Sequence, residues 1–195
     1  MTIVYMSRES LESLVERRRA TGAGRRDECW DGVWHLTDPT ARHQDIAGRI
    51  DRIHAEVVSD RGRGSVWISI NLTDREQRWK ENQRCPDGAV ILPGNPGRWV
   101  GDKQAAFLGG PDLVLETLSD DDGTYLKLPF YQSVGVREVL IVDPETCCPE
   151  HWRLEPGGYV RVAPPLRSDV TGVVYSQGPN VLEVTEPALG GSWKI

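Results

Sequence analysis

The segment VREVLIVDP, residues 136–144, is apolar without interruption through its centre, from Val139 to Val142. A strand with one solvated face alternates apolar and polar side chains, whereas a strand covered on both faces is apolar at successive positions. We therefore expect this segment to be an interior strand of a sheet that is covered on both sides. Such a strand, in a chain that also contains helices, favours a mixed α/β fold.

The clearest helix is expected over residues 43–59. An apolar stripe repeats there at steps of four, three and four, which places its members on one face of a helix; they are Ile46, Ile50, Ile53 and Val57. We expect this stripe to pack on the sheet beside Val90, Leu113 and Leu115.

Weaker patterns complete the arrangement. Helices are expected at residues 7–19 and 124–134, and a strand pair at 28–37 around an Asp-Gly turn. Strands are expected at residues 65–72, 85–92 and from Pro111 onward, and the Gly- and Pro-rich residues 93–110 are expected to form a surface loop. Beyond residue 150 we expect a hairpin around 156–158, with weak strand signals at 173–175 and 181–184.

Length and charge restrict the class of protein. A chain of 195 residues fits one domain. Its net charge of −6 argues against strong non-specific affinity for DNA, but not against an enzyme that reaches DNA through a local basic face and metal ions. The nearest such face is the arginine group 17, 18, 19, 25 and 26, which also fits a solvated helix end and loop.

Targeting and redox signals are weak. No segment approaches the length of a membrane span, and residues 1–15 lack the pattern of a signal peptide, so we expect no membrane association and a cytoplasmic location. In that compartment the four cysteines are expected to be free thiols. Neither a Gly-x-Ser-x-Gly elbow nor a nucleotide-binding glycine loop is present.

Carboxylates lie on the strand that begins at Pro111. Asp112 and Glu116 are four residues apart and can share a face, and Asp87 opens another apolar strand after a proline. If the two strands pair, Asp87 and Glu116 converge, and such a pair of hard oxygen ligands suits Mg²⁺ or Mn²⁺. Lys127 follows on a helix, where its ammonium can stabilise an oxyanion beside the metal.

The same residues have an ordinary structural interpretation. Carboxylates at strand ends often cap loops, so Asp112 can close the turn at GGPDL, and Lys127 can be a solvated helix residue. Spacing alone leaves both interpretations open, and a third, an unrelated α/β protein, remains.

The order of these motifs resembles the PD-(D/E)XK nuclease superfamily and, more closely, the bacterial Uma-two family of restriction-endonuclease-like domains. The matching segments span about residues 26–145; they are ECWDGVW, PTARHQDI, CPDGAVI, GGPDLVLETLS and KLPFYQSVGVREVLIVDPE. Any one of them is weak, whereas five in the correct order are a specific signal.

The resemblance implies a single domain over residues 1–195. It would have a restriction-endonuclease-like core at about 26–145, a mixed sheet flanked by helices, and a C-terminal β-hairpin extension at about 150–195. The resemblance also implies cleavage of DNA phosphodiester bonds with Mg²⁺ or Mn²⁺, and it admits a homodimer. By position, Asp87 and Glu116 would be the metal ligands and Lys127 the catalytic lysine, with Glu28, His43 and Gln44 as auxiliary residues. Asp112 is read mainly as structural.

The sequence departs from the family pattern near the lysine. The superfamily lysine follows the acid by two residues, where this chain has Leu118, although the family accepts a lysine on the next helix. Gly123 occupies the position of a usual Asp, the link before Lys127 is short, and Asp122 is an alternative acid. These departures, with the negative charge, favour a second function: a binding or regulatory module with the same fold and a weakened site.

Overall fold

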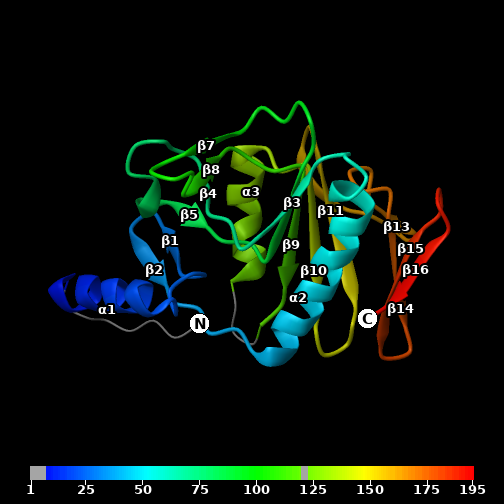
Figure 1. The fold of residues 1–195 in the computed structure, drawn as a ribbon, viewed down its shortest axis with the longest axis horizontal. Coiled ribbons are helices and arrows are strands. Elements are labelled where there is room, and N and C mark those ends of the chain that lie inside the picture. Colours follow the sequence, from blue (N-terminus) through cyan, green and yellow to red (C-terminus); the bar gives the residue numbers. More distant parts are fainter. Residues whose placement is uncertain (1–7, 120–122) are drawn as a thin grey trace.

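A computed structural model describes residues 8–119 and 123–195. Its central sheet has the strand order β12-β11-β10-β9-β6-β3 (Figure 1). β9 and β10 are parallel and the other neighbours are antiparallel, so the sheet is mixed. The strands are β3 (Ser65–Ile68), β6 (Gly88–Ile91), β9 (Leu113–Thr117), β10 (Glu138–Val142), β11 (Pro149–Glu155) and β12 (Gly158–Arg161). Every residue of β9 and β10 is buried, which confirms the interior strand expected from the apolar run at 136–144.

Helix α2 (Ala41–His54) covers one face of this sheet and continues as a π-helical turn, Ala55–Ser59 (Figure 1). The helix begins after Thr40, whose hydroxyl accepts a hydrogen bond from His43 N at 3.2 Å. The expected apolar stripe is buried in one cluster with the three predicted sheet residues. The sequence prediction for this helix and its packing is therefore confirmed.

A second antiparallel sheet, in the order β13-β14-β15-β16, contributes Tyr175, Leu182 and Val184 to the same cluster. Its strands are β13 (Leu166–Arg167), β14 (Val174–Gly178), β15 (Val181–Glu186) and β16 (Gly191–Lys194). The C-terminal region is thus more than the expected hairpin extension. The hairpin β11–β12 belongs to the central sheet, because β11 pairs with β10 along its length, and the chain then builds a sheet of its own.

The other face of the central sheet packs against α3 (Leu128–Val134) and a third sheet, in the order β2-β1-β5-β4-β8-β7 (Figure 1). Leu72, Phe107 and Tyr131 meet Val114 and Ile141 there. The strands of the third sheet are β1 (Glu28–Trp30), β2 (Val33–His35), β4 (Leu72–Thr73), β5 (Gln83–Arg84), β7 (Arg98–Val100) and β8 (Ala106–Leu108).

Two sequence predictions in this layer need correction. The strand expected at 65–72 is two strands in different sheets, because Ser69 adopts a left-handed conformation, with φ 52°, between them. The loop expected at 93–110 contains β7 and β8, and its Phe107 is buried in the core. By contrast, the β1–β2 hairpin is confirmed: Asp31 and Gly32 have φ values of 47° and 89°, as an Asp-Gly hairpin turn requires.

The remaining helices lie near the candidate site. α1 (Arg8–Thr21) precedes the β1–β2 hairpin, and a 3-10 turn, Thr124–Lys127, leads into α3. Pro129 lies in the first turn of α3, where a proline removes no helical hydrogen bond. None of the helices in the described ranges is long and apolar enough to cross a membrane. All four cysteines are free thiols.

Candidate active site

Glu116 is the centre of a buried polar cluster between the central sheet and α3. Its side chain is 4 % exposed, and both carboxylate oxygens lie 3.0 Å from Lys127 Nζ. The Tyr131 hydroxyl, one helical turn after Lys127, donates a short hydrogen bond to Oε1. Lys127 reaches Glu116 because the 3-10 turn places it directly before α3, on the side that packs against β9.

Glu28 brings a second carboxylate to the same lysine. Its Oε1 lies 2.9 Å from Lys127 Nζ and accepts a hydrogen bond from Cys85 N at 2.8 Å. Its Oε2 accepts one from Trp30 Nε1 at 2.6 Å. The third sheet therefore holds Glu28 rigidly, and Lys127 lies between carboxylates from two different sheets.

Asp87 lies at the adjoining end of the central sheet. Gly88 pairs with Leu115, so the antiparallel register places Asp87 opposite Glu116. Asp87 Oδ2 accepts a hydrogen bond from Thr117 N at 2.8 Å and is 3.2 Å from His43 Nε2, and Oδ1 accepts one from Arg26 Nη1 at 3.1 Å. The Asp87 carboxylate is thus held by the backbone of Thr117, by His43 on α2 and by Arg26 in the segment before β1.

The charged groups in this cluster shift one another's pKa values. Burial raises the pKa of Glu116 to about 7, and Asp87 and Glu28 add to the rise, while the ammonium of Lys127 opposes it. Burial alone would lower the pKa of Lys127, but the carboxylates of Glu116 and Glu28 outweigh it, so the pKa is raised. Lys127 is therefore a permanent cation at neutral pH.

Asp51 is a nearby acid that the sequence patterns did not indicate. It lies on α2, is 3 % exposed, and neither of its carboxylate oxygens has a hydrogen-bond partner among the described residues. Burial raises its pKa to about 8, Asp87 adds to the rise, and Arg26 opposes it. A lone aspartate among the buried residues of α2 gave no signal, because only the packing of α2 against Gly88 brings it close to Asp87.

Other expected residues lie elsewhere. Gln44 is exposed on α2, and within the described part of the chain its side chain donates a hydrogen bond to Pro39 O at 3.4 Å, away from the cluster. Asp112 accepts hydrogen bonds from Leu92 N, Asn95 Nδ2 and Arg137 Nη1, so it braces a loop, as its structural interpretation predicts. The alternative acid Asp122 lies outside the described residues.

The carboxylate oxygens at this site are the kind of ligand that a hard divalent cation prefers. Asp87 and Glu116 offer carboxylate oxygens at facing strand positions, the chemistry that Mg²⁺ and Mn²⁺ prefer. Within residues 8–119 and 123–195, no group of three or more His, Cys, Asp or Glu side chains is arranged to hold a metal ion. A cation would therefore take two protein carboxylates and complete its shell with water and substrate oxygens.

The basic residues near the site divide into two groups. Arg26 is paired with Asp87, and Arg18 with Asp27 at 2.7 Å, so these guanidiniums hold acids in place. Arg17, Arg19 and Arg25 are exposed. The interpretation as a solvated helix end and loop therefore fits Arg17, Arg19 and Arg25, which remain at the surface, but not Arg18 and Arg26.

Comparisons with known proteins identify the family and the fold. The model of the Uma2 (Uma-two) family, described as "Putative restriction endonuclease", matches residues 11–182. Among solved structures, the chain is similar to one described as "a putative nuclease belonging to DUF820" from Anabaena variabilis ATCC 29413. The TM-score is 0.55 at 18% identity, over 71% of this chain and 77% of that chain, a likeness that shows the fold. No curated protein matches.

Proposed function

This chain belongs to the Uma2 family, and from that membership we propose that it is a divalent-metal-dependent nuclease that hydrolyses DNA phosphodiester bonds. One observation carries the proposal. Lys127, 12 % exposed, is held between Glu28 and Glu116 beside Asp87, so acids and a lysine distant in sequence meet at one end of the sheet. A solvated helix lysine would have no reason to be buried against two carboxylates.

Asp87 and Glu116 are the residues that would hold Mg²⁺ or Mn²⁺. Bound there, the ion would polarise a phosphate oxygen and make a water molecule more acidic. The protein supplies the rest. Lys127 Nζ remains protonated and would neutralise charge that develops on the phosphate oxygens, while the carboxylate of Glu116 would serve as a ligand.

Glu28 and Tyr131 would position these groups. Glu28, fixed by Cys85 N and Trp30, keeps the Lys127 ammonium beside Glu116. Tyr131 donates to one oxygen of Glu116 and so orients the carboxylate. Fixed partners of this kind reduce the reorganisation needed when the substrate arrives.

The second candidate function is a binding or regulatory module with a weakened site. The observation in its favour is that protein groups already contact both oxygens of each carboxylate. Lys127 and Tyr131 contact Glu116, while Arg26, His43 and Thr117 N contact Asp87. A metal ion would have to compete with these partners.

Cutting of single-stranded and double-stranded DNA with Mg²⁺ or Mn²⁺, and its loss with EDTA, tests the proposal. We expect Asp87→Asn and Glu116→Gln to abolish cutting, because each removes a charged ligand at nearly constant volume. Lys127→Ala should reduce kcat while metal binding, followed by calorimetry, persists. Asp45→Asn on the exposed side of α2 is the matched control and should cut like the wild type.

Folding must be checked in parallel, because loss of Lys127 leaves two buried carboxylates without their cation. Circular dichroism and thermal unfolding of each variant serve this purpose. Cutting that survives all three substitutions in folded protein would place the chemistry elsewhere. Wild-type protein that binds DNA but cuts neither form with either metal would support the binding module.

A further inference from the structure

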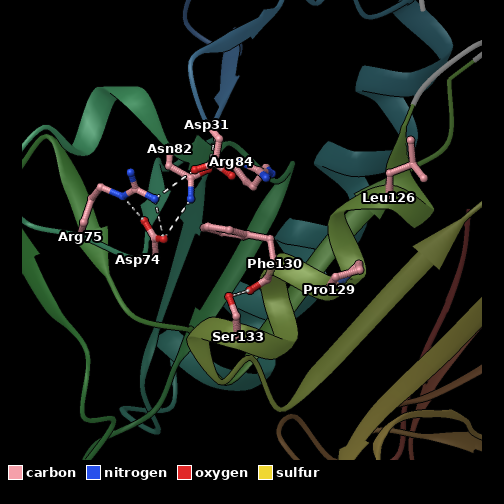
Figure 2. Close-up of a pocket in the computed structure, with 9 residues that line it drawn as sticks. All are labelled: Asp31, Asp74, Arg75, Asn82, Arg84, Leu126, Pro129, Phe130 and Ser133. Atoms are coloured by element: carbon pink, nitrogen blue, oxygen red, sulfur yellow. Dashed lines mark hydrogen bonds and ion pairs between the residues drawn. The ribbon is translucent and has the colours of Figure 1, made fainter.

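A pocket of about 350 Å³ opens between two parts of the structure (Figure 2). One is α3 with the 3-10 turn before it, and the other is β5 with the segment that connects β4 to β5. Leu126, Phe130 and Ser133 form one side of it, and Asp74 and Asn82 contribute to the other. The proposed reaction uses none of these residues. The pocket therefore has an apolar side, a polar side and no assigned role.

Arg84 lines this pocket and is an unusual cation. The residue is 6 % exposed, and its guanidinium lies 4.5 Å from the ring centroid of Trp30 and 4.3 Å from that of Phe130. Both rings cover the guanidinium, so a ligand can approach it only at an edge. Such stacking fixes the orientation of the guanidinium before any ligand binds.

Among the described residues, only one of the three guanidinium nitrogens of Arg84 donates hydrogen bonds. Nη1 donates to Cys29 O, Asn82 Oδ1 and Gln83 O, at 3.0–3.3 Å. Nε has no partner, and Nη2 donates to no group in the described ranges. None of the described carboxylates forms an ion pair with Arg84, although a buried charge normally has such a partner.

The two carboxylates of the pocket already have cationic and amide partners. Asp74 accepts hydrogen bonds from Arg75 Nε at 2.7 Å and from Asn82 Nδ2 at 3.0 Å, and Asp31 lies 3.1 Å from Arg75 Nη2 (Figure 2). Arg75 contacts both acids, so neither of them forms an ion pair with Arg84, although the charges of these four residues sum to zero. Burial lowers the pKa of Arg84, and the fields of Glu28, Asp31 and Asp74 oppose that effect without an ion pair.

The pocket shares its walls with the candidate active site. Trp30, which covers Arg84, donates to Glu28, and Cys85, which follows Arg84, donates its N–H to the same carboxylate. The pocket residues Leu126, on the 3-10 turn, and Phe130, on α3, directly precede Lys127 and Tyr131. A strand held at Lys127 would thus have its neighbouring nucleotide within reach of this pocket.

We infer that this pocket binds a phosphate group of the nucleic-acid strand, next to the phosphate held at Lys127, with Arg84 as its cationic partner. The inference rests on the proposed function for the identity of the strand. The fork of a guanidinium matches phosphate oxygens, and a phosphate would supply the direct ion pair that Arg84 lacks among the described residues. The apolar side formed by Leu126 and Phe130 would contact the sugar or base.

Binding of small nucleotides in EDTA tests this inference without any cleavage. The probes are thymidine, thymidine 5′-monophosphate and the dinucleotide TpT, titrated by calorimetry. The two phosphate probes distinguish a terminal monoester from an internal diester. Trp30 Nε1–H, followed by NMR, reports whether the ligand reaches the ring that covers Arg84. We expect at least one phosphate probe to bind about tenfold or more tightly than thymidine and to shift this signal.

Variants complete the test. Arg84→Met should remove the preference for phosphate over thymidine, and Arg84→Lys should retain part of it, because the charge stays and the fork is lost. Arg98→Met in β7 is the matched control, since this arginine is half exposed and pairs with Glu76 at the far edge of the same sheet. If Arg84→Met does not fold, Ser133→Trp, which fills the pocket, should abolish binding instead.

Equal binding of all three probes, no binding of any, or phosphate binding that persists in folded Arg84→Met or Ser133→Trp protein would overturn the inference. Failure of the proposed function has a different signature. In that case the phosphate preference remains and depends on Arg84, but no DNA is cut with either metal.

Discussion

Gly110 lies so close to the end of α3 that a side chain does not fit there. A Cβ at this position would be 2.4 Å from Val136 N and 2.6 Å from Gly135 C, both of them backbone atoms that cannot rotate away. We expect Gly110→Ala to lower the free energy of unfolding by roughly 1–3 kcal/mol or more, because the β8–β9 connection and the end of α3 must separate. Urea unfolding measures the change.

A matched control for this substitution exists in α2. A Cβ at Gly48 meets nothing within 4 Å, and the residue is exposed inside a helix. Gly48→Ala should raise the free energy of unfolding by about 0.5–1 kcal/mol, the usual gain in helix propensity. If both variants shift stability in the same direction, the close approach at Gly110 is not what determines the effect.

Asp51 gives a prediction about pH. Its pKa is about 8 in the folded protein, above the ordinary 3.8, so between these values the folded state keeps a proton that the unfolded state releases. Its contribution to stability is therefore complete below about pH 3.8 and is lost as the pH rises towards 8, with a limiting slope of about 1.4 kcal/mol per pH unit.

Asp51→Asn removes this loss, because the amide cannot ionise and has nearly the same shape. The variant and the wild type should have similar free energies of unfolding at about pH 4, and the variant should become progressively more stable up to about pH 8. Urea unfolding across this range is the measurement. A difference that does not change with pH would show that Asp51 titrates normally.

The element that organises the molecule is α2, which packs on the sheet through its apolar stripe. Ile50 is fully buried in the centre of that stripe. We expect Ile50→Ala to cost about 2–5 kcal/mol of unfolding free energy, whereas Arg52→Ala on the exposed side of the helix should change it by less than about 0.5 kcal/mol. Similar losses for both would mean that α2 is not docked as described.

Elements with a strong periodic pattern were predictable from the sequence. α2 and β10 follow from the apolar spacing, and the β1–β2 hairpin follows from its Asp-Gly turn. β7 and β8 were not predictable, because glycine and proline dominate residues 93–110 and only tertiary packing of Phe107 makes them strands. The break at Ser69 is similar, since no sequence pattern announces a left-handed serine.

The same limit applies to the candidate site. Asp87, Glu116 and Lys127 were accessible through their order and their resemblance to a family, and strand register now places Asp87 opposite Glu116. Asp51 and Arg84 were not, because their importance comes from burial and from the absence of an oppositely charged partner. Sequence patterns report which residues are apolar, but not which polar residue lacks a partner after folding.

At the scale of the whole molecule, charge limits how this protein can meet DNA. The chain carries a net charge of −6, and Arg17, Arg19 and Arg25 are exposed at and just after the end of α1. Each phosphate contact contributes about −0.9 to the slope of log affinity against log salt concentration, so these three arginines together with Lys127 and Arg84 should give a slope of about −4.5 for duplex DNA. Fluorescence anisotropy in EDTA measures this slope without cutting.

Arg25→Gln should weaken binding and make the slope shallower by about 1, because one phosphate contact is lost. Arg161→Gln on β12, at the edge of the central sheet and paired with Glu150, is the control and should leave the slope unchanged. An equal effect of both changes would mean that DNA responds only to net charge. A wild-type slope far steeper than about −4.5 would require a basic surface other than the end of α1, and the DNA would then approach the cluster from another side.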